Sequence, residues 1–231
     1  MELGLFLLWV ITTLLIVSVA MILGKKLGDF VFYTVFAMLI LVSNLVASKI
    51  LVIRVFDLNF ILPAGIVVYS VTFLLTDAIS EIYGKNTAKK TVLAGFIANL
   101  FAIPLIYITT LLPPADFNAE FAEKFNEVFK FVPQIIVASM LAYLVSQFHD
   151  VYAYHWYKKK TKGRFLWLRN NASTIISQLI DSVIFLSIAF YGIFSFDTIK
   201  NMIFFQWIAK IIIALIDTPF LYLIVYITRK L

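Results

Sequence analysis

The chain alternates between long apolar blocks and short polar segments along most of its length. Each block approaches the roughly 20 residues that a helix needs to cross the hydrocarbon core of a bilayer. The pattern therefore predicts an all-α polytopic membrane protein with about seven transmembrane helices, forming a single transmembrane domain over residues 1–231. The predicted helices cover residues 4–23, 30–54, 61–83, 91–112, 131–156, 171–194 and 202–228.

Composition supports this fold class. The 231 residues are 62% hydrophobic and only 14% charged, whereas a soluble domain carries about 25% charged residues. The first residues, MELGLFLLW, have an acid where a signal peptide has its basic region, so residues 4–23 are interpreted as a retained helix. The expected localisation is the plasma (cytoplasmic) membrane, which the chain crosses several times.

The 19 basic residues predict the orientation of these helices. Cytoplasmic loops carry the excess of lysine and arginine, so the richer side is predicted to be cytoplasmic. This places the N-terminus outside and the C-terminus in the cytoplasm, and it explains the net charge of +6 without a nucleic-acid partner. Four basic residues fall in the outer loops, and the 13 on the cytoplasmic side are Lys25, Lys26, Lys85, Lys89, Lys90, Lys158, Lys159, Lys160, Lys162, Arg164, Arg169, Arg229 and Lys230.

Two loops have patterns of their own. In the outer loop 113–130, phenylalanines recur every four residues from Phe117 to Phe129 with acidic residues between them. This spacing predicts an amphipathic helix on the outer surface, either resting on the bundle or forming a lid over an outer mouth. The cytoplasmic loop 157–170 is basic, which a topology signal explains as well as binding to anionic lipid does.

Polar residues interrupt the apolar blocks at helical spacing. The stretch LTDAISEIYGK carries Asp77 and Glu81 four residues apart, and SQFHD (146–150) and SQLID (177–181) each place Ser, Gln and Asp at i, i+1 and i+4. A carboxylate in hydrocarbon costs several kcal/mol unless it has a partner or water. The polar faces of five helices are therefore predicted to meet around a central, water-accessible cavity. The other two helices with such faces contribute Asn44 and Ser48, and Gln206, Lys210 and Asp217.

Several of these residues have alternative roles. Lys210 either neutralises Asp181 or Asp217 in a buried pair or contacts a substrate. Gln147 and Gln178 either line the cavity or join helices by hydrogen bonds. Glu81 is expected close enough to the membrane interface to be hydrated.

The sequence lacks the motifs of other function classes. It has no GxSxG, HExxH or Walker A motif and no cysteine, so no catalytic residues, metal ligands or cofactor are expected. His149 and His155 are six residues apart and do not share a helix face. The protein is thus expected to be no enzyme, but a carrier or the substrate-binding subunit of a larger importer.

Four stretches resemble the successive signatures of one family. SNLVASKI, PAGIVVYSVTFLLTDAISEIYGKNTAKK, ASTIISQLIDSVIFLSIAFYG and WIAKIIIALIDTPFLYLIVY are similar to the queuosine precursor transporter family, also called the vitamin-uptake-transporter or YhhQ-like family. The resemblance leaves out the first predicted helix and implies a six-helix core plus an N-terminal helix. The matching positions are Asn44, Lys49, Asp77, Glu81, Asp150, Ser177, Gln178, Asp181, Lys210 and Pro219.

The resemblance implies import of 7-deazaguanine bases, the 7-cyano (preQ0) and 7-aminomethyl (preQ1) precursors of the modified tRNA nucleosides queuosine and archaeosine. The expected partners are this nucleobase-like small molecule and the lipid bilayer, with the chain working alone or as a homodimer. The alternative is a substrate-binding subunit of an ATP-driven vitamin or nucleobase importer. The expected substrate-binding residues are Asn44, Asp77, Glu81, Gln147, Asp150, Ser177, Gln178, Asp181 and Lys210, with Phe73, Tyr143 and Tyr154 available for stacking on the base.

Overall fold

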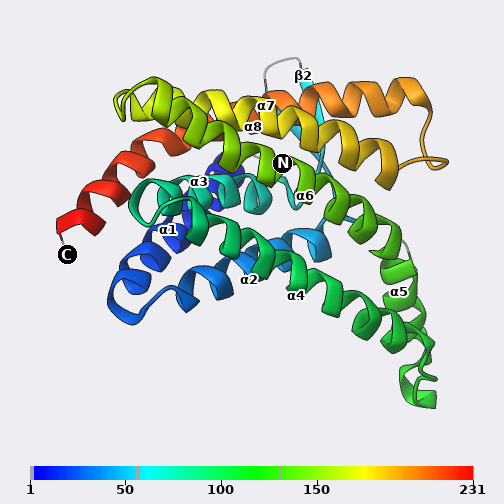
Figure 1. Cartoon of the computed structure of the whole chain (residues 1–231). Coiled ribbons are helices and arrows are strands. Elements are labelled where there is room, and N and C mark those ends of the chain that lie inside the picture. The colour runs from blue at the N-terminus through cyan, green and yellow to red at the C-terminus, as the bar shows by residue number, and fades with distance from the viewer. Residues whose placement is uncertain (1–2, 56–57, 131, 231) are drawn as a thin grey trace.

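The computed structural model describes residues 3–55, 58–130 and 132–230, most of them in long helices (Figure 1). Each of the seven predicted segments contains one long helix. Five of the described helices are long and apolar enough to cross a membrane, whereas α2 and α3 have only 17 residues each. The chain is thus an all-α membrane protein in outline. The long helices are α1 (Leu3–Leu27), α2 (Phe30–Val46), α3 (Ile66–Ile82), α4 (Lys85–Leu111), α6 (Val132–Lys160), α7 (Leu166–Ala189) and α8 (Phe196–Lys230).

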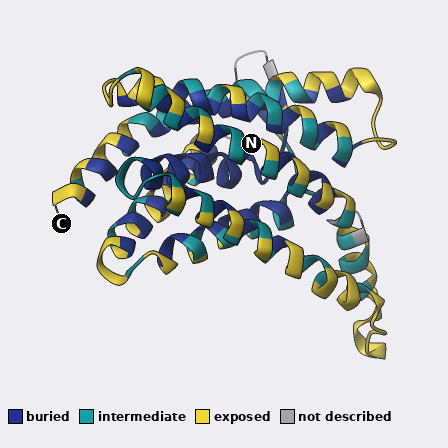
Figure 2. Ribbon diagram, viewed as in Figure 1, coloured by how far each residue is buried: buried dark blue, intermediate teal, exposed yellow. Residues whose placement is uncertain are grey.

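Helix α3 is the centre of the bundle. Every residue from Ile66 to Ser80 is buried, and α3 contacts each of the other six long helices. Figure 2 shows this concentration of buried positions in the middle of the molecule, while α4 and the helices at the rim expose one side. A helix that is buried all round has no lipid-facing stripe, so its polar residues can only face other helices.

A β-hairpin replaces part of the predicted helices. The expectation of helix over 30–54 and from residue 61 is wrong at these ends, because α2 stops at Val46 and strands β1 (Ile50–Val55) and β2 (Leu58–Pro63) pair antiparallel. The run of isoleucine and valine favours extended backbone. Ile53 and Phe60 pair on the inner face and are buried, and the ring of Phe60 packs on Phe205 of α8 at 5.2 Å.

Gly65 joins the hairpin to α3 and lets two backbones approach closely. A Cβ atom at this position would overlap the backbone carbonyl of Ser43 in α2. The absence of a side chain therefore allows the end of α2 to cross the start of α3. This crossing forms one wall of the cavity described below.

Helix α5 (Ala119–Lys130) lies in the outer loop, where the sequence predicts a helix, and the basic loop is shorter than predicted. Residues 113–130 contain a 3₁₀ turn (Asp116–Asn118) and α5, which runs from beyond the end of α4 back towards the start of α6 (Figure 1). Phe117 is 96% exposed, whereas Phe125 and Phe129 pack ring against ring at 4.4 Å. The basic loop predicted over 157–170 shortens to residues 161–165, because α6 continues to Lys160 and α7 begins at Leu166.

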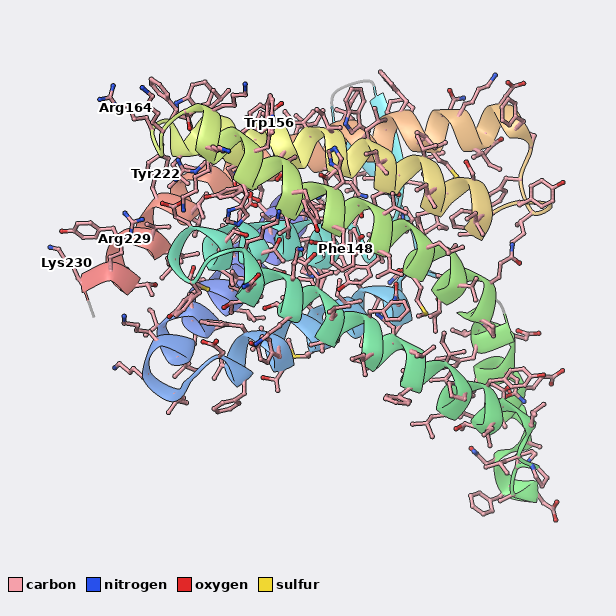
Figure 3. The ribbon with its side chains drawn as sticks, in the orientation of Figure 1. Phe148, Trp156, Arg164, Tyr222, Arg229 and Lys230 are labelled. Carbon is pink, nitrogen blue, oxygen red and sulfur yellow. The ribbon has the colours of Figure 1, made fainter. Side chains whose placement is uncertain are left out.

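The basic segments gather at one end of the molecule. The α1–α2, α3–α4 and α6–α7 connections and the C-terminus all lie at the left in Figure 1, where Figure 3 labels Arg164, Arg229 and Lys230. We call this the basic end. The arrangement agrees with the predicted orientation, in which this end faces the cytoplasm.

The orientation can be tested by labelling single cysteines, because the natural chain has none. We expect a membrane-impermeant maleimide to label Phe117→Cys on intact cells, and Lys160→Cys only after the membrane is permeabilised. Both positions are exposed on the protein, so labelling reports the side of the membrane. The reverse pattern would invert the predicted topology.

Candidate functional site

Polar side chains of α3, α6, α7 and α8, most of them buried, form three layers along the bundle. The ion-pair layer lies nearest the hairpin and consists of Tyr69, Ser146, Asp181 and Lys210. The acidic layer follows and consists of Asp77, Asp150, Thr174 and Asp217. The Glu81 layer lies at the basic end and consists of Glu81, Tyr154, Lys158, Arg169 and Arg229.

Helical spacing sets the distance between these layers. On α3, Tyr69 is followed by Asp77 after eight residues and by Glu81 after four more. At 1.5 Å per residue these steps are about 12 Å and about 6 Å along the axis. The same order recurs on α6, where Ser146, Asp150 and Tyr154 are four residues apart.

The ion-pair layer is built around Asp181. Lys210 Nζ lies 2.6 Å from Asp181 Oδ2, and the two side chains are 1% and 5% exposed. The hydroxyl of Tyr69 donates to Asp181 Oδ1 at 2.5 Å, and Ser146 Oγ donates to the same oxygen at 3.2 Å. Of the two alternatives that the sequence leaves open, Lys210 thus pairs with Asp181 and not with Asp217.

A small cavity of about 40 Å³ borders this ion pair on the side of the hairpin. Gln206 is 3% exposed and its Nε2 donates to Ser182 Oγ at 3.3 Å, but its Oε1 has no hydrogen-bond partner among the described residues. The cavity is therefore lined by a cation, a carboxylate, amides and aromatic rings. The lining residues used below are Asn44, Tyr69, Asp181, Phe185, Gln206 and Lys210.

Asn44 belongs to a side-chain network in the cavity wall. Its Nδ2 donates to Asn99 Oδ1 at 3.0 Å, and its Oδ1 accepts from Ser139 Oγ at 2.6 Å. The network joins α2, α4 and α6. Because both ends of the amide are engaged, the orientation of Asn44 is fixed beside the cavity.

The acidic layer brings three carboxyl groups together from three helices. Asp77 and Asp150 lie within hydrogen-bonding reach of each other, and Thr174 Oγ1 lies 3.5 Å from Asp77 Oδ2 and 3.4 Å from Asp150 Oδ1. Asp217 interacts electrostatically with both of the other carboxyl groups and also interacts with the side chain of Asn170. No basic side chain of the described residues forms an ion pair with any of the three.

The Glu81 layer corrects the expectation that Glu81 is hydrated. Its side chain is only 6% exposed and contacts Arg169 at 2.6 Å, Arg229 at 2.7 Å and Lys158 at 2.8 Å. Tyr154 also donates to it at 3.1 Å. One carboxylate thus joins α3 to α6, α7 and α8 at the basic end.

Arg169 is the residue of this layer that the sequence assigns to the wrong environment. It is predicted to lie in the cytoplasmic loop, yet it is 1% exposed because α7 already starts at Leu166. Its remaining N–H groups donate to the carbonyl oxygens of Gly163 and Arg164 and to Tyr154. A lone basic residue followed by polar asparagines at the start of an apolar helix is the signal that could have indicated burial.

Of the remaining predicted polar residues, Gln147 and Ser177 make structural hydrogen bonds and the side-chain amide of Gln178 makes none among the described residues. Gln147 donates to Thr72 Oγ1 at 3.0 Å and accepts from Thr76 at 3.4 Å, so it joins α6 to α3 as a helix-joining amide. Ser177 is hydrogen-bonded to His149 Nδ1 at 2.8 Å. Gln178 is 1% exposed, and neither polar atom of its amide has a partner among the described residues.

None of the three predicted stacking residues lines the cavity. Phe73 is wholly buried, Tyr143 donates to the backbone oxygen of Val92, and Tyr154 belongs to the Glu81 layer. The aromatic residues that do line it are Tyr69 and Phe185, which an apolar sequence block does not distinguish from its neighbours.

Lys49 also lies elsewhere than predicted. It is expected inside a helix, but the structure places it, exposed, in the turn between α2 and β1. Its backbone oxygen accepts from Ala64 at 2.7 Å and closes the base of the hairpin.

A family model described as "Putative vitamin uptake transporter" matches residues 63–224, which is more than half of the 231 residues. The chain belongs to the vitamin uptake transporter family. This confirms the resemblance seen in the sequence. The matched range contains all three layers apart from Arg229, and every predicted site residue except Asn44.

Two curated relatives of this vitamin uptake transporter family member carry the name "Probable queuosine precursor transporter". The protein from Bacillus subtilis (strain 168) is 34% identical over 159 residues, which cover 68% of this chain and 69% of the relative. The protein from Haemophilus influenzae is 27% identical over 135 residues, covering 58% and 54%. No solved structure matches the chain significantly.

Family membership settles the general class of this protein. It is a multi-pass transporter of the plasma membrane and not an enzyme. The alternative of a binding subunit for an ATP-driven importer finds no support in these comparisons.

The buried ion pair makes a prediction about stability. We expect Lys210→Met to lower the free energy of unfolding by about 3–5 kcal/mol, because Asp181 is left buried without its cation. The double variant Lys210→Met/Asp181→Asn should regain most of this loss. The measurement is thermal unfolding in detergent.

The matched control for this experiment is Lys200→Met. Lys200 pairs with Asp197 at 3.6 Å, but both side chains are largely exposed, so its loss should leave the melting temperature unchanged. A double variant as unstable as Lys210→Met alone would contradict the assigned pairing.

The Glu81 layer makes a second prediction about stability. Glu81→Gln should lower the free energy of unfolding by about 3 kcal/mol, because Arg169 loses its anion while it stays buried. Arg229→Gln removes another partner of the same carboxylate, but its guanidinium is 59% exposed, so the loss should be much smaller. Equal melting temperatures of these two variants would argue against a structural role for the Glu81–Arg169 pair.

Proposed function

We propose that this transporter imports queuosine precursors of the 7-deazaguanine class, and that the base binds in the cavity beside the Lys210–Asp181 ion pair. The names of the two relatives support this substrate class. The family resemblance in the sequence implies the same substrate class, with 7-cyano- and 7-aminomethyl-7-deazaguanine as the two forms.

The observation that carries the proposal is the set of polar groups on the cavity wall. A guanine-like base has adjacent N–H donors on one edge, a carbonyl acceptor and a flat apolar face. The cavity presents a carboxylate acceptor in Asp181, a cationic donor in Lys210 and an unpartnered amide oxygen in Gln206. These groups are complementary to the edge of such a base.

The existing contacts leave hydrogen-bonding capacity for the base on Asp181 and Lys210. Oδ1 of Asp181 already accepts from Tyr69 and Ser146, whereas within the described part of the chain Oδ2 accepts only from Lys210. Each carboxylate oxygen accepts about two hydrogen bonds, so Oδ2 can take an N–H of the base. Lys210 has three N–H groups and donates one to Asp181, which leaves donors for the carbonyl of the base.

Aromatic side chains support the same position. Lys210 Nζ lies 5.2 Å from the centre of the Tyr69 ring, so the ring and the ion pair are adjacent. Tyr69 and Phe185 both line the cavity and offer faces or edges for a flat base. In this proposal Asn44, Asp181, Lys210 and Gln206 contact the substrate, and the acidic layer lies deeper.

Purified protein in liposomes tests this function. We expect saturable uptake of a labelled 7-deazaguanine precursor without ATP or a partner protein, with competition by unlabelled precursor. Gln206→Leu should raise KM at least about tenfold, because a buried hydrogen bond to the ligand is lost. The measurement is initial uptake rate against substrate concentration.

Gln134→Leu is the matched control. Gln134 is exposed and donates to the backbone oxygen of Ile188, outside the cavity, so KM should not change. Folded protein that takes up neither precursor would refute the proposed function, and uptake that requires an added ATPase subunit would favour the binding-subunit alternative.

A further inference from the structure

The acidic layer differs from its two neighbours in how its charges are compensated. Asp181 has Lys210 as an ion-pair partner, and Glu81 has three basic partners. Asp77, Asp150 and Asp217 are 0%, 0% and 2% exposed and have no cation partner among the described residues. Each of the three also has one carboxyl oxygen without a hydrogen-bond partner there.

The nearest cations are committed elsewhere. Arg169 directs its N–H groups to Glu81, to Tyr154 and to the carbonyl oxygens of the α6–α7 turn. Lys210 is two helical turns away from Asp217 and is bound to Asp181. Neither can neutralise the acidic layer without breaking its own contacts.

The other polar groups around the layer are uncharged or belong to the Glu81 layer. Helix α6 contributes Tyr154 and His149, of which Tyr154 interacts electrostatically with Asp77 and His149 is bonded to Ser177. Helix α7 contributes Thr174, Asn170 and Ser173. Three ionised carboxylates in such a place would be strongly unfavourable, whereas protonated carboxyl groups can be buried at little cost.

Asn170 of α7 supports a proton on this layer. It is 2% exposed and interacts with Asp217, and its amide oxygen has no hydrogen-bond donor among the described residues. A protonated Asp217 supplies an O–H that such an oxygen can accept. An ionised Asp217 offers only acceptors and leaves the amide oxygen buried without a partner.

A metal ion fits the layer less well than protons do. No group of three or more acidic or histidine side chains within the described residues has the geometry to hold a metal. The hydroxyl of Thr174 lies between Asp77 and Asp150, and those two carboxyl groups are close enough to share a proton.

We propose that the acidic layer of Asp77, Asp150 and Asp217 is a proton-binding site that makes this transporter a proton symporter. The inference rests on the proposed function, because it assigns the energy source of that import. The substrate binds one layer above, on the same four helices, at Asp181 and Lys210. With its protons bound, the layer is neutral and can stay dehydrated while the helices rearrange, whereas the ionised layer needs water. Loaded protein therefore carries the proton and the base together.

Proteoliposomes at clamped membrane potential test the coupling. With labelled 7-deazaguanine precursor outside, we expect an inward pH gradient of 1.5 units to raise the initial uptake rate at least about fivefold over equal pH. A protonophore should abolish this increase. Addition of precursor at equal pH should acidify the vesicle lumen, as reported by a trapped pH dye.

Binding to detergent-purified protein tests the site itself. For the wild type, precursor affinity should fall as pH rises from 5.5 to 8, because the loaded form carries the proton. Asp77→Asn and Asp150→Asn should each weaken this pH dependence, and the triple variant Asp77→Asn/Asp150→Asn/Asp217→Asn, whose layer cannot ionise, should lose it. Asp197→Asn, whose carboxylate is 90% exposed at the start of α8, should behave as the wild type.

The outcomes separate this inference from the proposed function. Exchange of labelled for unlabelled precursor without any gradient tests import alone. Exchange that proceeds while uptake ignores the pH gradient, or responds instead to a sodium gradient, overturns the proton site and leaves the proposed function intact. Affinity that stays fully pH-dependent in a folded triple variant would assign the proton to another residue and overturn the proposal.

Discussion

A buried polar side chain in an apolar bundle must find its partner on another helix, and Asp181 shows how far this constraint reaches. Its carboxylate binds Lys210 of α8, Tyr69 of α3 and Ser146 of α6, so one group on α7 fixes four helices. Removing any one of these partners leaves the remaining polar groups buried with an unpaired charge or an unmade hydrogen bond, which destabilises the fold. In the ion-pair layer, the residues of the candidate site are therefore also the residues that hold the four helices together.

The central helix extends this arrangement along the bundle. Because α3 is buried all round, the side chains of Tyr69, Asp77 and Glu81 cannot reach lipid or water. Each must find its polar or charged partners on α6, α7 and α8. The matching differs from layer to layer. Asp181 is matched by one cation and Glu81 by three, while the carboxyl groups between them are matched only by one another and by neutral groups. The layer without cations is the one that needs protons to be stable.

Helical spacing in the sequence predicts which residues are buried and polar, but not how they pair. Asp77, Asp150, Asp181 and Lys210 are identifiable because each interrupts an apolar block. Tyr69 is missed because a tyrosine in such a block resembles core packing, and only the position of Asp181 across the bundle gives it a polar role. The hairpin is missed because its isoleucine and valine residues fit a membrane helix as well as a strand. Arg169 is missed because its role depends on where α7 begins.

The two ends of the bundle are held by different forces, and this difference bears on how a substrate moves. At the basic end, four helices are joined through Glu81, and two of its ion-pair partners reach the surface. Beside the hairpin, the wall of the cavity is made of neutral amides, aromatic rings and one ion pair of zero net charge. In the proposed function, the uncharged 7-cyano form can therefore reach Asp181 from the hairpin side by exchanging hydrogen bonds, without separating charges. Exit through the basic end would require Glu81 to give up its contacts with Arg169 and Lys158, so in this proposal the Glu81 layer is the larger barrier to passage.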